Sequence, residues 1–372
     1  MDTAATPPQA SAEPGLDGAR PVASDRANLV TALLGTWFTV GLFLDAWAHN
    51  NVPRLETFFT PWHGVLYSGF VASGGWIAWT VRDGLRAGRF DVRAVPLGYA
   101  SSAVAVVGFA IAGGADLAWH TAFGIEQNID ILFSPTHIAL IAAMLVIVTT
   151  PVRAMWADRS LAAAPGLRRL LPALLSACLA TTLVLLFLQY ANALVFTSRD
   201  VVIGLSRLDL DFTARLVTAM AVTNLVLVAP LLTLARRWEL PFGTATLLAL
   251  AAGGLSLAVT AFRNVPLIGA VVLAAAGVDL LARWLRPAPD RLIRYRAFGG
   301  LASLVTWTVY VTAGYVTAGG GFAGSGPDEH PEGVVALYTG APVVQAGLGV
   351  LLAILLVPSR QPHARADEPP TV

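Results

Sequence analysis

Residues 170–195 read LLPALLSACLATTLVLLFLQYANALV, a run without a single charged side chain. An α-helix rises about 1.5 Å per residue, so roughly 20 apolar residues cross the ~30 Å hydrocarbon layer of a bilayer. Similar runs recur along the chain and predict an all-α, polytopic membrane bundle of ten transmembrane helices. Their predicted cores are 29–48, 62–81, 95–119, 135–152, 170–195, 213–234, 242–262, 265–285, 297–317 and 334–357.

The composition agrees with a lipid environment. Of 372 residues, 56% are hydrophobic and only 13% are charged, and the mean hydropathy is +0.66. So few charged side chains cannot cover a soluble core, which excludes a water-soluble globular enzyme. The net charge of +1 also excludes a nucleic-acid-binding protein. The single cysteine, Cys178, excludes an intrachain disulfide and a thiolate metal cluster, so His, Asp and Glu are the candidate metal ligands.

Arginine placement predicts the orientation, because cytoplasmic loops carry the excess of positive charge. With the N-terminus inside, 19 of the 24 basic residues, all of them arginine, fall on the cytoplasmic side. Ten crossings place the C-terminus on that side as well. We therefore expect a multi-pass protein of a bacterial plasma membrane with cytoplasmic tails at 1–28 and 358–372.

The first four predicted helices, within 29–152, contain two copies of one pattern. Residues 44–69 read LDAWAHNNVPRLETFFTPWHGVLYSG, and residues 115–140 read ADLAWHTAFGIEQNIDILFSPTHIAL. Four of the six histidines of the chain occupy equivalent positions in the two copies. The matched pairs are Asp45 with Asp116, His49 with His120, Glu56 with Glu126, Phe59 with Phe133, Thr60 with Ser134, Pro61 with Pro135 and His63 with His137. The six helices predicted within 153–357 hold no second histidine cluster.

This pattern predicts where the side chains lie. Asp and His four residues apart share one helix face, here in the last turn of the first and third helices. Thr60-Pro61 and Ser134-Pro135 are typical of an N-cap followed by proline at the first helical position, which places His63 and His137 in first turns. All four helix ends are extracytoplasmic in the predicted topology. The two hairpins run in the same direction, so we expect the two sets of ligands to converge at one membrane depth.

Two imidazoles and one carboxylate form an open three-ligand set that suits copper, iron or zinc. We therefore predict Asp45, His49 and His63, and Asp116, His120 and His137, as metal ligands. The alternative is that the aspartates only pair with histidines at helix ends near interfacial water. Glu56 and Glu126 are candidate supporting carboxylates or plain loop residues. The segment with Asp328, Glu329 and His330 follows Gly319–Gly321 and is a candidate lid or a solvated acidic loop.

These residues resemble the metal motif in one membrane subunit of the copper-dependent membrane monooxygenases, which oxidise methane, ammonia or short alkanes. The resemblance rests on Asp-x-x-x-His followed by Pro-x-His, covers about 26 residues in each copy, and implies that Asp45, His49, His63, Asp116, His120 and His137 bind copper. The chain departs from the family in having two copies of the motif, longer loops between the histidines, more helices, and no cupredoxin-like domain.

Three classes of function follow from the sequence. The resemblance favours a copper-dependent membrane oxidoreductase. A metal-binding or metal-transporting membrane protein without redox chemistry and a membrane haem protein are the alternatives. The sequence indicates no substrate, electron donor or partner protein.

Overall fold

The computed structural model describes residues 20–52, 59–85, 91–124, 131–206, 209–318 and 331–359. Every regular element within these ranges is helical, which confirms the predicted all-α class. The α-helices are α1 (Asp25–Asn51), α2 (Pro61–Leu85), α3 (Ala100–Phe123), α4 (Pro135–Val148), α5 (Thr150–Ala157), α6 (Leu167–Phe187), α7 (Ser198–Leu205), α8 (Leu210–Ala235), α9 (Thr244–Val259), α10 (Val265–Leu285), α11 (Leu292–Thr317) and α12 (Pro331–Leu356). Short 3₁₀ turns occupy Val92–Ala94, Gln189–Ala191 and Ala193–Val195.

The described helices fit a multi-pass membrane protein. Seven of them, α1, α3, α6, α8, α10, α11 and α12, are long and apolar enough to cross a bilayer, and the bent pair α4–α5 is an eighth candidate. With α2 and the 16-residue α9, a helix or helix pair stands in each of the ten predicted segments. The count of ten crossings stays a prediction. α1 begins at Asp25, so residues 25–28 of the predicted tail are helical.

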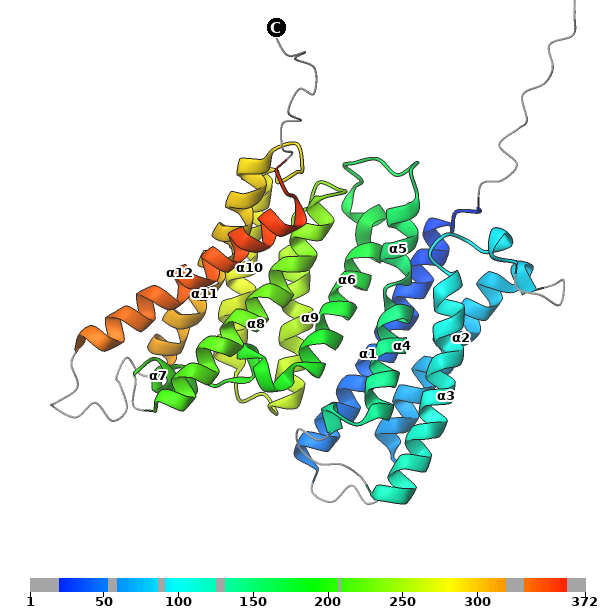
Figure 1. Ribbon diagram of the computed structural model, residues 1–372, viewed down its shortest axis with the longest axis horizontal. Helices are drawn as coiled ribbons and strands as arrows, with labels where there is room; N and C mark the ends of the chain where they lie inside the picture. Colours follow the sequence, from blue (N-terminus) through cyan, green and yellow to red (C-terminus); the bar gives the residue numbers. More distant parts are fainter. Residues whose placement is uncertain are drawn as a thin grey trace, which may run out of the picture.

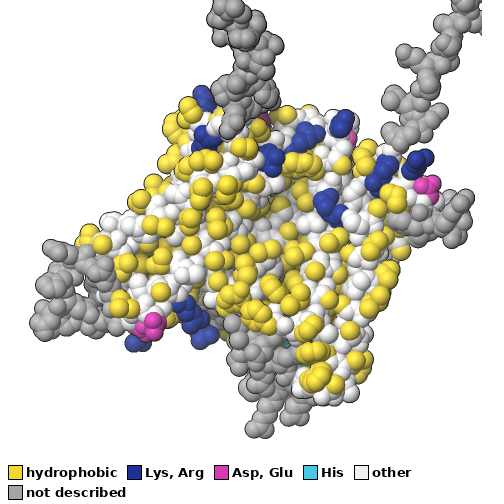
Figure 2. Space-filling model, in the orientation of Figure 1, with side chains coloured by type: hydrophobic (Ala, Val, Ile, Leu, Met, Phe, Trp, Pro, Cys, Tyr) yellow, Lys and Arg dark blue, Asp and Glu magenta, His cyan; other side chains and the backbone are white. Residues whose placement is uncertain are grey.

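Side chains on the outside of the bundle are suited to lipid. Figure 2 shows apolar side chains across the flanks of the bundle. Exposed large apolar residues include Trp79 on α2, Ile111 on α3 and Leu273 on α10. Most of the arginines visible in the same view gather at one end, and a smaller group lies at the opposite end. The start of α1 and the end of α12 both lie at the end with most of the arginines (Figure 1).

The bundle contains two main hydrophobic cores. One core joins α1–α4 with α6 around Phe38, Phe109 and Met144. The larger core joins α6–α12 around Trp307 and Tyr310 of α11. Figure 1 shows α1–α5 grouped on one flank and α8–α12 mostly on the other, with α6 between them. α6 contributes to both cores and so connects the two parts.

The predicted fourth helix is broken rather than continuous. α4 and α5 meet at a bend of 42°. Pro151 lacks the N–H group that would bond to the carbonyl of Ile147, and the Thr150 hydroxyl donates to that carbonyl instead at 2.6 Å. Arg153 donates to the carbonyl of Val146, also at 2.6 Å. Side chains thus bond to both backbone carbonyls at the bend, including the one that the proline leaves without an N–H donor.

The predicted fifth helix ends early. α6 stops at Phe187, and the chain continues through two 3₁₀ turns to Val195. Tyr310 of α11 donates to the carbonyl of Ala193 at 2.6 Å, and the N–H of Ala193 donates to Thr223 of α8 at 2.8 Å. Because neighbouring helices satisfy this backbone, a non-helical turn is stable inside the bundle.

Candidate metal centre

The structure brings the predicted ligands together in two groups. Group one is Asp45, His49 and His63; group two is Asp116, His120 and His137. Within each group, one ligand atom from every residue lies within 4.8 Å of the others. Each group joins the C-terminal part of one helix, α1 or α3, to the first turn of the next, α2 or α4. The predicted clustering of these residues is confirmed, and their role as ligands stays a prediction.

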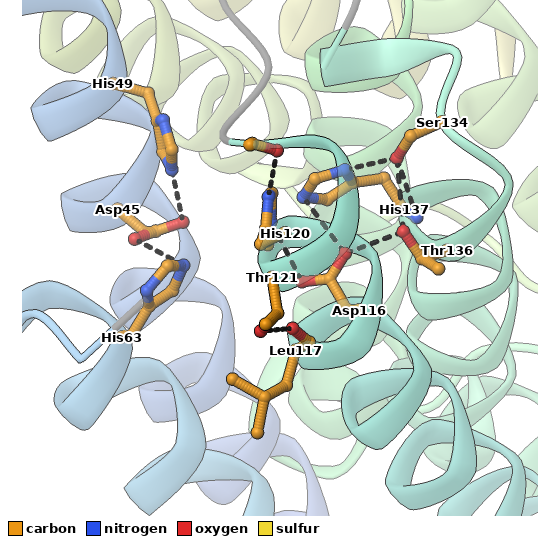
Figure 3. Close-up of polar contacts among 11 residues, drawn as sticks. Asp45, His49, His63, Asp116, Leu117, His120, Thr121, Ser134, Thr136 and His137 are labelled. Atoms are coloured by element: carbon orange, nitrogen blue, oxygen red, sulfur yellow. Dashed lines mark hydrogen bonds and ion pairs between the residues drawn. The ribbon is translucent and has the colours of Figure 1, made fainter. Parts of the chain in front are cut away.

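In group one, the carboxylate of Asp45 lies between two imidazoles. Its Oδ2 is 3.7 Å from His49 Nε2, and its Oδ1 is 3.4 Å from His63 Nε2, as Figure 3 shows. The two imidazole rings meet edge to face with centroids 5.9 Å apart. The Thr60 hydroxyl accepts from the backbone N–H of His63 at 3.1 Å, so this residue acts as the predicted N-cap.

Two glycines allow α1 and α2 to approach closely enough for group one to form. A Cβ added at Gly41 would lie 2.7 Å from the Cα of Leu66, and one at Gly69 would lie 2.6 Å from the Cα of Phe38. Such distances are too short for any side chain, so backbone meets backbone at both places. Gly41 lies one turn before Asp45, which places this contact next to the ligands.

Group two has the same plan. Asp116 Oδ2 is 3.4 Å from His120 Nε2, and Asp116 Oδ1 is 3.9 Å from His137 Nε2. The imidazole centroids are 5.7 Å apart. The Ser134 hydroxyl caps α4 by accepting from the backbone N–H of His137 at 3.3 Å. Both groups therefore have a carboxylate facing two Nε2 atoms.

Three further contacts orient the side chains of group two. The Thr136 hydroxyl donates to Asp116 Oδ1 at 2.6 Å. His120 Nδ1 donates to the backbone carbonyl of Gly124 at 3.2 Å, because a carbonyl can only accept. The Ser134 hydroxyl also lies 2.5 Å from His137 Nδ1. Contacts of this kind fix the tautomer of a metal-binding imidazole and direct its other nitrogen at the ion.

Both groups line one cavity of about 450 Å³. Asp45 and Asp116 both line it, and Figure 3 shows the two groups side by side. The expected convergence of the two sets of ligands is therefore present as a shared cavity. Its walls combine these polar residues with apolar side chains from α1–α4 and α6.

The cavity contains residues that the sequence did not single out as functional. Tyr67 of α2 lines it, with its ring centre 6.3 Å from that of His63. Arg215 of α8 also lines it, with its guanidinium carbon 5.7 Å from the ring centre of Phe196. Arg215 belongs to the few arginines on the predicted extracytoplasmic side, which is the one signal that sets it apart.

The donor set fits a transition-metal ion. Asp45 and Asp116 are 8% and 2% exposed, and a buried carboxylate needs compensating positive charge. A cation bound by the facing Nε2 atoms would supply that charge, and two histidines with one carboxylate would leave coordination positions open. Among the described residues, these two groups are the only clusters of three His, Cys, Asp or Glu that can hold an ion.

Five predicted site residues lie outside the described part of the chain. They are the candidate supporting carboxylates Glu56 and Glu126 and the candidate lid residues Asp328, Glu329 and His330. No protein-family model, curated protein or solved structure matches the chain. The resemblance to the copper-dependent monooxygenases therefore rests on the motif residues themselves.

Proposed function

We propose that this chain is a membrane-embedded copper protein that binds one ion in each Asp-His-His group and oxidises a small, mostly apolar substrate in the cavity between them. The observation that carries the proposal is the pair of three-ligand groups on one cavity. Iron and zinc fit the same donor types, and the motif resemblance favours copper.

The side chains have distinct roles in this proposal. The four Nε2 atoms and the two carboxylates hold the ions, and the hydrogen bond from His120 Nδ1 to Gly124 keeps Nε2 available for the ion. Copper held there would supply oxygen activation, in which one oxygen atom of O₂ would enter a substrate C–H bond and the other would leave as water, with two electrons and two protons from an external donor. Tyr67 offers a hydroxyl donor at the cavity wall.

The cavity wall suggests the substrate class. Leu42, Phe109, Leu140 and Met144 line the cavity together with the ligand groups. Apolar side chains of this kind bind hydrocarbon-like molecules by removing their surface from water. A small substrate with an oxidisable C–H bond fits such a cavity.

The membrane arrangement belongs to the same proposal. We infer ten crossings, both termini in the cytoplasm of a bacterium, and two duplicated hairpins, α1–α2 and α3–α4, with their ligands at the extracytoplasmic face. Support comes from the arginine-rich end in Figure 2 and from the opposite position of the ligand groups in the bundle. Phe38 and Phe109, each seven residues before its aspartate, pack against each other with centroids 5.0 Å apart, as equivalent residues do beside a pseudo-twofold axis.

A transport role without redox chemistry has less support. A translocated ion needs successive ligands across the membrane, and both described clusters that can hold an ion lie at the same end of α1–α4. In the described parts of α6–α12 no further such cluster occurs. A haem protein is distinguished by its Soret band, which we do not expect.

The test is oxygen uptake by purified protein loaded separately with copper, iron or zinc, in the presence of a chemical reductant and a short alkane. We expect uptake that depends on both copper and alkane, together with an oxygenated product detected by mass spectrometry. His49→Ala and His120→Ala should reduce it at least tenfold, whereas His363→Ala, outside both motif copies, should not. Tight copper binding without substrate-dependent uptake would refute the oxidase role and favour simple metal binding.

A further inference from the structure

We infer that the two groups are not equivalent: group two holds its ion first and longest, and group one is the exchangeable site that faces the cavity. This inference rests on the proposed binding of metal by both groups and goes beyond it by assigning different tasks to them. It follows from the residue that precedes the second histidine of each group and from the burial of the ligands.

The sequence difference lies one residue before the second histidine. Group two has Thr136 at this position, and its hydroxyl donates to Asp116 Oδ1 at 2.6 Å. The equivalent residue of group one is Trp62, whose indole packs edge-on against Trp47 with centroids 5.4 Å apart. The threonine therefore adds an orienting hydrogen bond to the carboxylate of group two, whereas the equivalent residue of group one packs against Trp47.

The histidines of group two are oriented as well. Gly124, which follows α3 with a φ of +84°, turns its carbonyl back to accept from His120 Nδ1. A side chain disfavours this left-handed conformation, so glycine is suited to the turn. On the other side, Ser134 contacts His137 Nδ1. All three ligands of group two thus have an orienting partner before any ion binds.

Exposure to the cavity also differs. All three residues of group one line the cavity, whereas group two reaches it through Asp116 and His137. The side chains of Asp116 and His120 are only 3% and 5% exposed, compared with 11% for each residue of group one. His137, at 24%, is the most exposed ligand of group two. An ion in group two is therefore held by two deeply buried ligands and a third that Ser134 orients, and an ion in group one lies against the open space.

Pre-orientation has a measurable effect on affinity. Removing a partner that orients a metal ligand lowers metal affinity by about 10- to 100-fold. Thr136→Val removes the hydroxyl at nearly constant volume, and Thr136→Ser retains it. In group two, we expect Thr136→Val to weaken copper binding by about tenfold and Thr136→Ser to restore it.

The experiment uses full-length protein in which one group is disabled at a time. His49→Ala with His63→Ala leaves group two, and His120→Ala with His137→Ala leaves group one. Copper(I) affinity is measured by competition with a chromophoric chelator. We expect at least about tenfold tighter binding in the protein that retains group two.

Thr136→Val should lower the copper(I) affinity of the protein that retains group two. It should change the copper(I) affinity of the protein that retains group one by less than twofold. Wild type should release copper to excess chelator in two phases, of which Thr136→Val accelerates only the slow one. Equal affinities, tighter binding by group one, or no effect of Thr136→Val on group two would overturn the inference while leaving metal binding intact. Absence of copper binding in both proteins and in wild type would refute the proposed function and this inference with it.

Discussion

A methyl group added at Gly41 should disable group one and leave group two unchanged. The Cβ of Gly41→Ala would lie 2.7 Å from the Cα of Leu66 and 2.8 Å from its backbone nitrogen. Ordinary contact begins at 3.4 Å, so α1 and α2 must separate locally by about 0.7 Å. Because both contacting atoms belong to the backbone, rotation of a side chain cannot relieve the clash. Overpacking of this kind costs about 1–3 kcal/mol.

The consequence for the metal follows from the position of Gly41 one turn before Asp45. Metal–ligand distances tolerate about 0.2 Å, so a shift of about 0.7 Å between α1 and α2 removes His63 from the coordination shell. In the second hairpin, the positions equivalent to Gly41 and Gly69 are Ala112 and Ala143, so group two forms without these glycines. We expect Gly41→Ala to lose about half of the bound copper.

The assay is elemental analysis of copper per chain after loading and desalting, with thermal unfolding measured on the same samples. Gly64→Ala and Gly75→Ala are matched controls on α2, because a Cβ at either position meets no atom within 4 Å. Both controls should keep full copper content and unchanged or higher stability, since alanine favours helix more than glycine does. Full copper content in Gly41→Ala would refute the close-approach explanation of group one.

Three further predictions address the topology, the larger core and the cavity. A cysteine at Arg159, in an otherwise cysteine-free chain, should resist impermeant thiol reagents in intact cells, and labelling from outside would refute the predicted orientation. Asp279→Ala should lower the free energy of unfolding by about 1–3 kcal/mol, because the carboxylate accepts from two N–H groups at the start of α9. Denaturant unfolding measures this change, and the copper content should stay the same. Gly113→Ala places a Cβ 3.2 Å from the hydroxyl of Tyr67. It should displace the phenol and so lower substrate-dependent oxygen uptake. The control Gly114→Ala, whose Cβ has open space around it, should take up oxygen as wild type does.

The sequence was sufficient to predict the two groups because local rules position their residues. The spacing of Asp45 and His49 fixes one helix face, and Thr60 and Ser134 mark the starts of the next helices. Clustering across each hairpin then needs only a short connection between its helices. That both groups line one cavity depends on how the hairpins pack, which the spacing within each copy does not determine.

Other features depend on contacts between distant segments. Tyr67 and Arg215 reach the cavity from α2 and α8, and no local pattern marks them as partners of the ligands. Thr136 looks like an ordinary first-turn residue until Asp116, 20 residues earlier in the chain, is placed beside it. The early end of α6 likewise depends on Tyr310, which lies 117 residues from the carbonyl it satisfies.

Some missed elements had a local signal. α7 begins with Thr197 as N-cap, and Asp200 accepts from its backbone N–H in return, which is the capping-box pattern. Thr149, Thr150 and Pro151 together mark the break between α4 and α5. Both signals lie within or beside apolar stretches, where length and hydropathy predict one continuous crossing.

The central claim is that these six residues bind metal, and copper content per chain tests it most directly. Elemental analysis of purified, copper-loaded protein should give two ions for wild type, about one for either His49→Ala or His120→Ala, and none for the double variant. Correct folding of each variant is verified by its monodisperse elution in detergent. Wild-type copper content in the double variant would show that the histidines only pair with Asp45 and Asp116 at the helix ends, and would contradict the account.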